Sequence, residues 1–210
     1  NILENINLSI PAGSFIGILG KTGSGKTTLA NILAKFYEIP TGKIFFNDID
    51  INDIERKSFY EKFAYVMQDD YIYDNTIKHN IELYKNYEKN EVKEATKKAE
   101  LFDTIEKLDK KYDTLIGDNG IKLSGGQKQR LILSRNLITN PNILIIDNGF
   151  TGLDIDTRKK VIDNLNNRNN KATLVIISSM MEDIKNADKI YKLENKTLVE
   201  INMEEEVYDA

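Results

Sequence analysis

The segment Phe15-Ile-Gly-Ile-Leu-Gly20-Lys-Thr-Gly-Ser-Gly-Lys-Thr27 predicts the fold class, because it joins a strand pattern to a glycine-rich loop. An apolar run, Phe15–Leu19, leads into the pattern Gly-x-x-x-x-Gly-Lys-Thr, and an amphipathic segment around Thr28–Phe36 follows. In such a strand–loop–helix unit, glycines let backbone N–H groups turn around an anion, and the helix N-terminus adds its dipole. The lysine supplies a positive charge, and the threonine hydroxyl can bind Mg²⁺. The stretch predicts a nucleotide phosphate site formed by Gly20, Lys21, Thr22, Gly23, Ser24, Gly25, Lys26, Thr27 and Thr28.

Apolar, β-branched runs recur along the chain and predict buried strands at Phe15–Leu19, Ala64–Met67, Ile143–Ile146 and Leu174–Ile177. Each run is followed by polar or glycine residues and then by a helical pattern, which is typical of a parallel sheet with crossover helices. Three short segments are predicted to be antiparallel strands on the rim: Ile44–Phe46, Lys189–Leu193 and Thr197–Ile201.

The alternation of strand and helix patterns stops between Tyr71 and Thr139. There, apolar residues recur at helical spacing in three segments: Thr76–Tyr84, Glu91–Leu101 and Ser124–Ile138. The sequence therefore predicts an α/β fold with a mostly parallel sheet, a small antiparallel β rim and an inserted α-helical subdomain. We expect residues 1–70 and 139–202 to form the core, 71–138 the helical subdomain and 203–210 a frayed tail.

The amino-acid composition of the chain argues against some classes of function. The chain has 210 residues, 40% of them hydrophobic, which is enough for one domain with a substantial core. Its 29 basic and 33 acidic residues give a net charge of −4, which argues against nucleic acid as a partner. There is no cysteine, no signal-peptide pattern and no apolar run of the length that spans a bilayer. Since the chain opens with Asn1 rather than methionine, we expect it to be part of a longer protein.

A second glycine-rich helix start, Leu123-Ser-Gly-Gly-Gln127, presents a serine hydroxyl and bare amides to an anion. Ser124 could equally be an ordinary helix N-cap. Because one nucleotide rarely needs two such helix starts in one chain, we expect this one to close over the nucleotide of another chain. Asp147, at the end of the Ile143–Ile146 run, is either a helix cap or a Mg²⁺ ligand, and its pairing with the phosphate loop favours the metal.

These motifs together resemble the nucleotide-binding domain of ABC transporters over essentially the whole chain. Gly20–Thr27 resembles the Walker A motif, Leu123–Gln127 the ABC signature, Ile143–Asp147 Walker B, Gly152–Asp154 the D-loop and Gln68 the Q-loop glutamine. The segments Gln68–Ile77 and Thr114–Gly120 are similar to those of exporters. The resemblance implies a P-loop NTPase (RecA-like) core, ATP and Mg²⁺ as cofactors, and Thr27, Gln68 and Asp147 as metal ligands.

The resemblance also implies partners and a location. A second ABC subunit would meet this chain at the signature residues Leu123, Ser124, Gly125, Gly126 and Gln127 and at the D-loop residues Leu153 and Asp154. Coupling helices of a transmembrane domain would dock near Gln68–Thr76, and that domain would hold the chain at the cytoplasmic face of the cell membrane. The family's aromatic adenine platform lies upstream of a segment like Ile2–Ile10, so we expect it outside this chain. The resemblance also implies that the membrane domain selects the transported substrate.

Two positions depart from the family pattern. Asn148 stands where a glutamate normally polarises the attacking water, and Ser179 stands where a histidine normally touches the γ-phosphate. Thr151 replaces the usual D-loop serine, and the only histidine, His79, is expected to be a surface or packing residue. With Gln68 retained and the signature intact, the pattern resembles the poorly hydrolysing half of a heterodimeric exporter.

Other interpretations stay open at this point. A slow homodimer, in which an amide only orients water, fits the same residues, as do engineered changes at Asn148 and Ser179. A regulatory domain that senses nucleotide without transport is a further alternative. A soluble ABC-type ATPase acting on DNA or ribosomes would need a coiled-coil insertion or tandem domains with a basic linker, and the sequence contains neither.

Overall fold

The computed structural model describes residues 2–120, 122–167 and 172–202. Its internal contacts group the chain into two units. The core unit contains the described residues of 1–65, 142–147 and 172–210, and the helical unit contains those of 66–141 and 148–171. The sequence-based division at residues 70/71 and 138/139 stays a prediction, and the predicted frayed tail, 203–210, lies outside the described residues.

A six-stranded sheet with the order β4-β5-β6-β1-β7-β8 forms the centre of the core unit. Its strands are β1 (Phe15–Leu19), β4 (Phe63–Val66), β5 (Ile143–Asp147), β6 (Thr173–Ser178), β7 (Lys189–Glu194) and β8 (Thr197–Ile201). β1 pairs in parallel with β6, and β6 pairs in parallel with β5, so these three strands end at one edge of the sheet. The prediction of an α/β fold with a mostly parallel sheet is confirmed.

The prediction that Lys189–Leu193 is an antiparallel rim strand was wrong. β7 pairs in parallel with β1, and only β8, beyond it, runs antiparallel. The chain leaves β6, forms the short helix η4 (Met181–Asp183), and enters β7 on the other side of β1. Ile190, Tyr191 and Leu193 are buried, so β7 is an interior strand whose apolar residues belong to the core.

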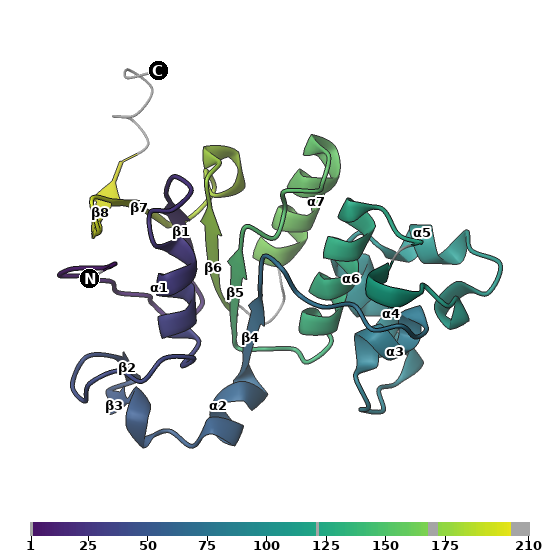
Figure 1. Ribbon diagram of the computed structural model, residues 1–210, viewed down its shortest axis with the longest axis horizontal. Coiled ribbons are helices and arrows are strands. Elements are labelled where there is room, and N and C mark those ends of the chain that lie inside the picture. Colours follow the sequence, from purple (N-terminus) through teal and green to yellow (C-terminus); the bar gives the residue numbers. More distant parts are fainter. Residues whose placement is uncertain (1, 121, 168–171, 203–210) are drawn as a thin grey trace. The chain divides into compact units, whose positions relative to one another are not determined.

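Helix α1 (Lys26–Leu33) packs against this sheet, and in Figure 1 it crosses in front of β1. Leu29 and Ala30 point into one hydrophobic cluster with Ile18 and Val175 of the strands. A separate two-stranded antiparallel hairpin pairs β2 (Phe45–Phe46) with β3 (Ile49–Asp50), as expected for the 44–46 segment. The helices η1 (Ile51–Asp53) and α2 (Arg56–Lys62) then lead to β4.

The helical unit contains α3 (Ile77–Glu82), α4 (Lys89–Lys98), α5 (Phe102–Glu106), η2 (Lys111–Asp113), η3 (Asp118–Gly120), α6 (Gly125–Leu137) and α7 (Ile155–Asn166). Across the described residues from Tyr71 to Thr139, the only strand pairing is an isolated bridge between Thr76 and Leu115. Helix α7 contacts α4, and just beyond the end of α4 the Asn164 side chain donates a 2.7 Å hydrogen bond to the Glu100 carboxylate. Within the described ranges, no helix combines the length and apolar character that crossing a bilayer requires.

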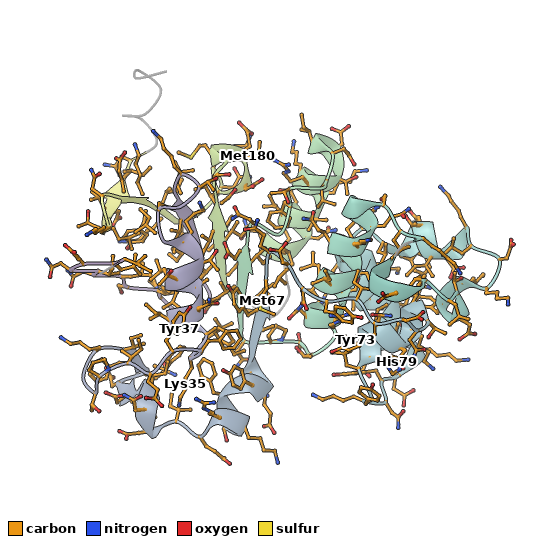
Figure 2. The ribbon with its side chains drawn as sticks, viewed as in Figure 1. Lys35, Tyr37, Met67, Tyr73, His79 and Met180 are labelled. Atoms are coloured by element: carbon orange, nitrogen blue, oxygen red, sulfur yellow. The ribbon has the colours of Figure 1, made fainter. Side chains whose placement is uncertain are left out.

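A buried arginine organises the segment that precedes α3. Arg135 of α6 is 8% exposed and donates to the backbone carbonyls of Tyr71 and Asn80, each at 2.7 Å. The fully buried Asn80 side chain in turn accepts from the Tyr73 N–H and donates to the Tyr73 carbonyl. Tyr73, labelled in Figure 2, lies under the Arg135 guanidinium at 5.5 Å. His79 contacts the Tyr84 ring edge-on, which agrees with its expected packing role.

Candidate functional site

The glycine-rich loop joins β1 to α1 in a conformation that its glycines make possible. Gly23 and Gly25 adopt φ values of 81° and 101°, which L side chains rarely adopt. A Cβ added to Gly20 would lie 2.6 Å from the Ser24 hydroxyl, so a side chain there would fill the loop. The Gly20 N–H donates to the Ser178 carbonyl at 3.1 Å, which ties the start of the loop to the end of β6.

Lys26 is 5% exposed and folds back over the loop. Its ammonium donates to the carbonyls of Gly20 and Lys21, each at 2.8 Å. Burial lowers the pKa of the Lys26 ammonium, and the Asp147 carboxylate partly offsets that effect. A desolvated cation whose hydrogen bonds go to neutral carbonyls gains strongly from a bound anion, which is what a phosphate group would supply.

Thr27 and Asp147 are brought together, as the metal-site prediction requires. The Thr27 hydroxyl donates a 2.6 Å hydrogen bond to Asp147 Oδ2. Asp147 is fully buried, and its Oδ1 has no well-aligned hydrogen-bond partner among the described residues. The Ser24 hydroxyl in the loop is likewise buried and unpaired within the described ranges. These oxygen donors beside a phosphate cradle fit Mg²⁺, which prefers a carboxylate and a hydroxyl together with phosphate oxygens.

Sequence reasoning missed two residues around Asp147. Tyr65 of β4 places its hydroxyl near the Asp147 carboxylate and donates a 3.1 Å hydrogen bond to the Asn31 side-chain carbonyl of α1. Burial, followed by the charge of Asp147, raises the pKa of Tyr65 well above its usual range. The only signal in the sequence was a hydroxyl-bearing aromatic residue inside an otherwise apolar strand.

We expect Asp147→Asn to stabilise the metal-free chain against unfolding at neutral pH by about 0.5–2 kcal/mol. The reason is that the substitution removes a buried charge, which costs free energy in the folded state. Burial raises the pKa of Asp147, so the folded state favours the protonated carboxyl. The wild type therefore gains stability as pH falls through that raised pKa, and the difference between variant and wild type shrinks toward acid pH. Urea unfolding in EDTA at a series of pH values measures this. A variant less stable than wild type at neutral pH would contradict the explanation.

In the helical unit, Asn148 and Gln68 are brought together. The Asn148 amide donates to the Gln68 Oε1 at 3.3 Å. Asn148 has a φ of 48°, in the left-handed region that asparagine tolerates better than most residues. An amide can accept a hydrogen bond from water but cannot take its proton at neutral pH, so neither side chain of this pair can act as a general base.

Ser178, the last residue of β6, and Ser179, the residue after it, differ sharply in their exposure to solvent. Ser178 is buried, donates to the Asp183 carboxylate at 2.5 Å and accepts from the Met180 N–H at 3.0 Å. Ser179 is exposed, directly before Met180, which Figure 2 labels. The Ser178 carbonyl also accepts the hydrogen bond from the Gly20 N–H, so the end of β6 lies beside the phosphate loop. Ser179 is the next residue after that strand end.

The second glycine-rich start forms the N-terminus of α6. Ser124 Oγ accepts from the Gln127 N–H at 3.2 Å, and Gln127 Oε1 accepts from the Ser124 N–H at 2.9 Å, which is a capping box. The N-cap interpretation is therefore correct for Ser124, and a capped helix start can still present its amides. Nothing lies within 4 Å of a Cβ added to Gly125, so that face of the helix start is open among the described residues.

Helix α6 also contacts the segment 151–154, which includes the predicted D-loop, Gly152–Asp154. Gln129 donates to the Thr151 hydroxyl at 2.9 Å and accepts from the Gly152 N–H at 2.8 Å. A Cβ added to Gly126 would lie 2.5 Å from the Gly152 carbonyl oxygen. Asp154 caps α7 by accepting from the Thr157 N–H, and this bond lowers the pKa of its carboxyl. Gln129 had no signal of its own in the sequence.

The phosphate loop at the end of a parallel strand, the paired threonine and aspartate, and the helical unit define a P-loop nucleotide-binding domain. Residues 3–151 match the family model described as ABC transporter. The chain belongs to the ABC transporter family, which confirms the resemblance predicted from its motifs.

Its relatives are similar over almost the whole chain. An ATP-dependent lipid A-core flippase of Haemophilus influenzae is 36% identical over 95% of this chain and 36% of its own length. A putative multidrug export ATP-binding/permease protein of Bacillus subtilis is 32% identical over 100% of this chain and 36% of its own length. The structure of a bacterial Atm1-family ABC exporter with ATP bound superposes with a TM-score of 0.89 at 33% identity, over 94% of this chain and 35% of that one. The chain thus spans about a third of the length of these proteins.

Proposed function

We propose that this chain is the domain of an ABC exporter that binds Mg-ATP and dimerises around it to drive transport. The observation that carries the proposal is the buried pair of Lys26 and Asp147 beside a loop that a side chain at Gly20 would fill. Asp147 accepts a hydrogen bond from the Thr27 hydroxyl at Oδ2, and its Oδ1 is unpaired among the described residues. Bound ATP would supply the phosphate charge and bound Mg²⁺ would neutralise it. Lys26 and the loop amides would hold the phosphates, and Thr27 and Asp147 would bind the metal. The family resemblance adds Gln68 as a further proposed metal ligand.

Hydrolysis in this chain's own site is proposed to be slow. Asn148 replaces the carboxylate that would accept the water's proton, and losing such a base costs about 10²–10⁴ in rate. Ser179 is too short to reach as far as a histidine from the same backbone position. The chain therefore orients water through amides at best, and holds ATP longer than it cleaves it.

The signature is proposed to serve a partner. The open face at Gly125 and the amides of the capped α6 start are available to phosphates brought by a second ABC subunit, with Leu153 and Asp154 following in the adjoining loop. In the favoured form the partner is a different chain that retains the glutamate and histidine. A slow homodimer and a nucleotide-sensing domain without transport are the alternatives, and an ATP-dependent homodimer in sedimentation would favour the first of them.

Docking of a membrane domain is proposed at Gln68–Thr76. Arg135 and Asn80 fix the backbone of this segment from inside, while Tyr71 and Tyr73 are 53% and 39% exposed on its outer side. Rigid, exposed aromatic residues are suited to protein contacts. The names of two relatives, a lipid A-core flippase and a putative multidrug export ATP-binding/permease protein, support this proposal. We therefore also propose the cytoplasmic face of the membrane as the location.

Calorimetric titration with ATP, ADP and AMP tests the binding function. We expect saturable binding of ATP that strengthens with Mg²⁺ and weakens from ATP to ADP to AMP, because the proposed contacts are all to phosphates and the metal. Equal affinity for all three nucleotides, or no binding of ATP at high concentration, would contradict the proposal.

A further inference from the structure

The chain contains two Asn-Gly pairs, Asn119-Gly120 and Asn148-Gly149. In this dipeptide the glycine nitrogen can attack the asparagine side-chain carbonyl carbon, since glycine has no Cβ to obstruct the approach. A C–N bond forms and closes a succinimide ring, the bond to the side-chain NH₂ breaks, and ammonia leaves. Water then opens the ring at either carbonyl, which gives aspartate or isoaspartate. Water is the only co-reactant.

The two attacking nitrogens differ in the structure. The Gly120 N–H donates a 3.0 Å hydrogen bond to the Gly117 carbonyl within the turn that forms η3. No group among the described residues accepts a hydrogen bond from the Gly149 N–H, and Gly149 lies outside every helix and strand. The nitrogen of Gly149 is therefore free to lose its proton and attack, whereas that of Gly120 must first give up a bond.

The group under attack is also poorly held at Asn148. Its side chain is half-buried, in the turn that follows β5, and the hydrogen bond from its amide to Gln68 is long at 3.3 Å. Asn148 also carries the positive φ of 48°. Neither a regular backbone ladder nor a short side-chain bond restrains the turn.

We propose that Asn148 is a deamidation site, at which the chain itself converts the amide following Asp147 into a carboxylate. The product carries one more negative charge. Asn148 now donates a hydrogen bond to the Gln68 side chain, whereas the product's carboxylate oxygens could accept one from the Gln68 NH₂ group. Deamidation thus places an acid at the position where this chain lacks one. The step is a property of the chain's own covalent chemistry and stands whether or not the chain binds ATP.

The test is peptide mapping of the folded chain after incubation at mildly alkaline pH, with fragment ions that locate the amide-to-acid mass increase and chromatography that separates aspartate from isoaspartate. In the folded chain we expect Asn148 to convert about 2- to 12-fold faster than Asn119, the factor expected from one backbone hydrogen bond. In urea the two pairs should convert at similar rates.

Two variants test whether Asn148 is the residue that deamidates. Gly149→Ala should slow conversion at position 148 and leave Asn119 unchanged, and because Gly149 has no positive φ, alanine is compatible with its backbone. Asn148→Asp provides the product standard. Conversion of Asn119 ahead of Asn148 in the folded chain, or the same ratio of rates folded and unfolded, would overturn the proposal.

Discussion

Lys26→Ala is expected to weaken Mg-ATP binding by about 2–5 kcal/mol, or about 30-fold to several thousandfold. The ammonium is 5% exposed and bonded only to the loop carbonyls of Gly20 and Lys21. Removing it leaves the phosphates without their buried cation and those carbonyls turned toward an anion. Calorimetric titration of the variant with Mg-ATP measures the loss.

A matched control is Lys57→Ala, which removes an exposed lysine from α2 in the same unit. We expect its ATP affinity to equal that of the wild type. Near-wild-type binding by Lys26→Ala would mean that the nucleotide does not use this loop, whereas equal losses in both variants would indicate a general electrostatic effect.

Gly125 and Gly126, the adjacent glycines of the predicted signature, are expected to differ sharply in their effect on stability when each is replaced by alanine. A Cβ at Gly126 would lie 2.5 Å from the Gly152 carbonyl oxygen, which is a backbone atom and cannot rotate away as a flexible side chain could. Such overpacking costs about 1–3 kcal/mol of unfolding free energy. A Cβ at Gly125 meets nothing within 4 Å, so alanine there should be neutral or stabilise α6 by up to about 1 kcal/mol.

Urea unfolding of the two variants, followed by helical circular dichroism, measures this difference. Because the two sites are one residue apart on the same helix, general helix propensity cannot produce opposite effects. Similar stability of Gly126→Ala and Gly125→Ala would show that α6 and the segment 151–154 do not pack as closely as described.

The phosphate loop and the parallel strands could be predicted from sequence because both are local patterns. The glycines at 20, 23 and 25 are required by their own backbone angles and close approach, and buried parallel strands are continuous apolar runs. The direction of β7 could not be predicted in this way. Its apolar residues fit either an interior or a rim strand, and only the crossover past β1 decides that it runs parallel.

The pairing of Thr27 with Asp147 could be predicted from the topology of the sheet. β1 and β5 run parallel and end at the same edge, so the loop after β1 lies near the end of β5. Tyr65, Asn31 and Gln129 were missed because their roles depend on which elements face each other, and a hydroxyl or amide in a strand or helix has no spacing signal. The capping role of Ser124 was open in the sequence, and its two bonds with Gln127 decided it.

The central claim is that the chain holds Mg-ATP and cleaves it slowly. The most direct measurement incubates freshly prepared chain, with Asn148 verified by mass, with Mg-ATP, removes free nucleotide and identifies what remains bound. We predict that the bound nucleotide is ATP, with hydrolysis about 10²–10⁴ slower than in an ABC domain that has the carboxylate base. Bound ADP with rapid release of phosphate would contradict the claim, because Asn148 would then not be limiting the chemistry.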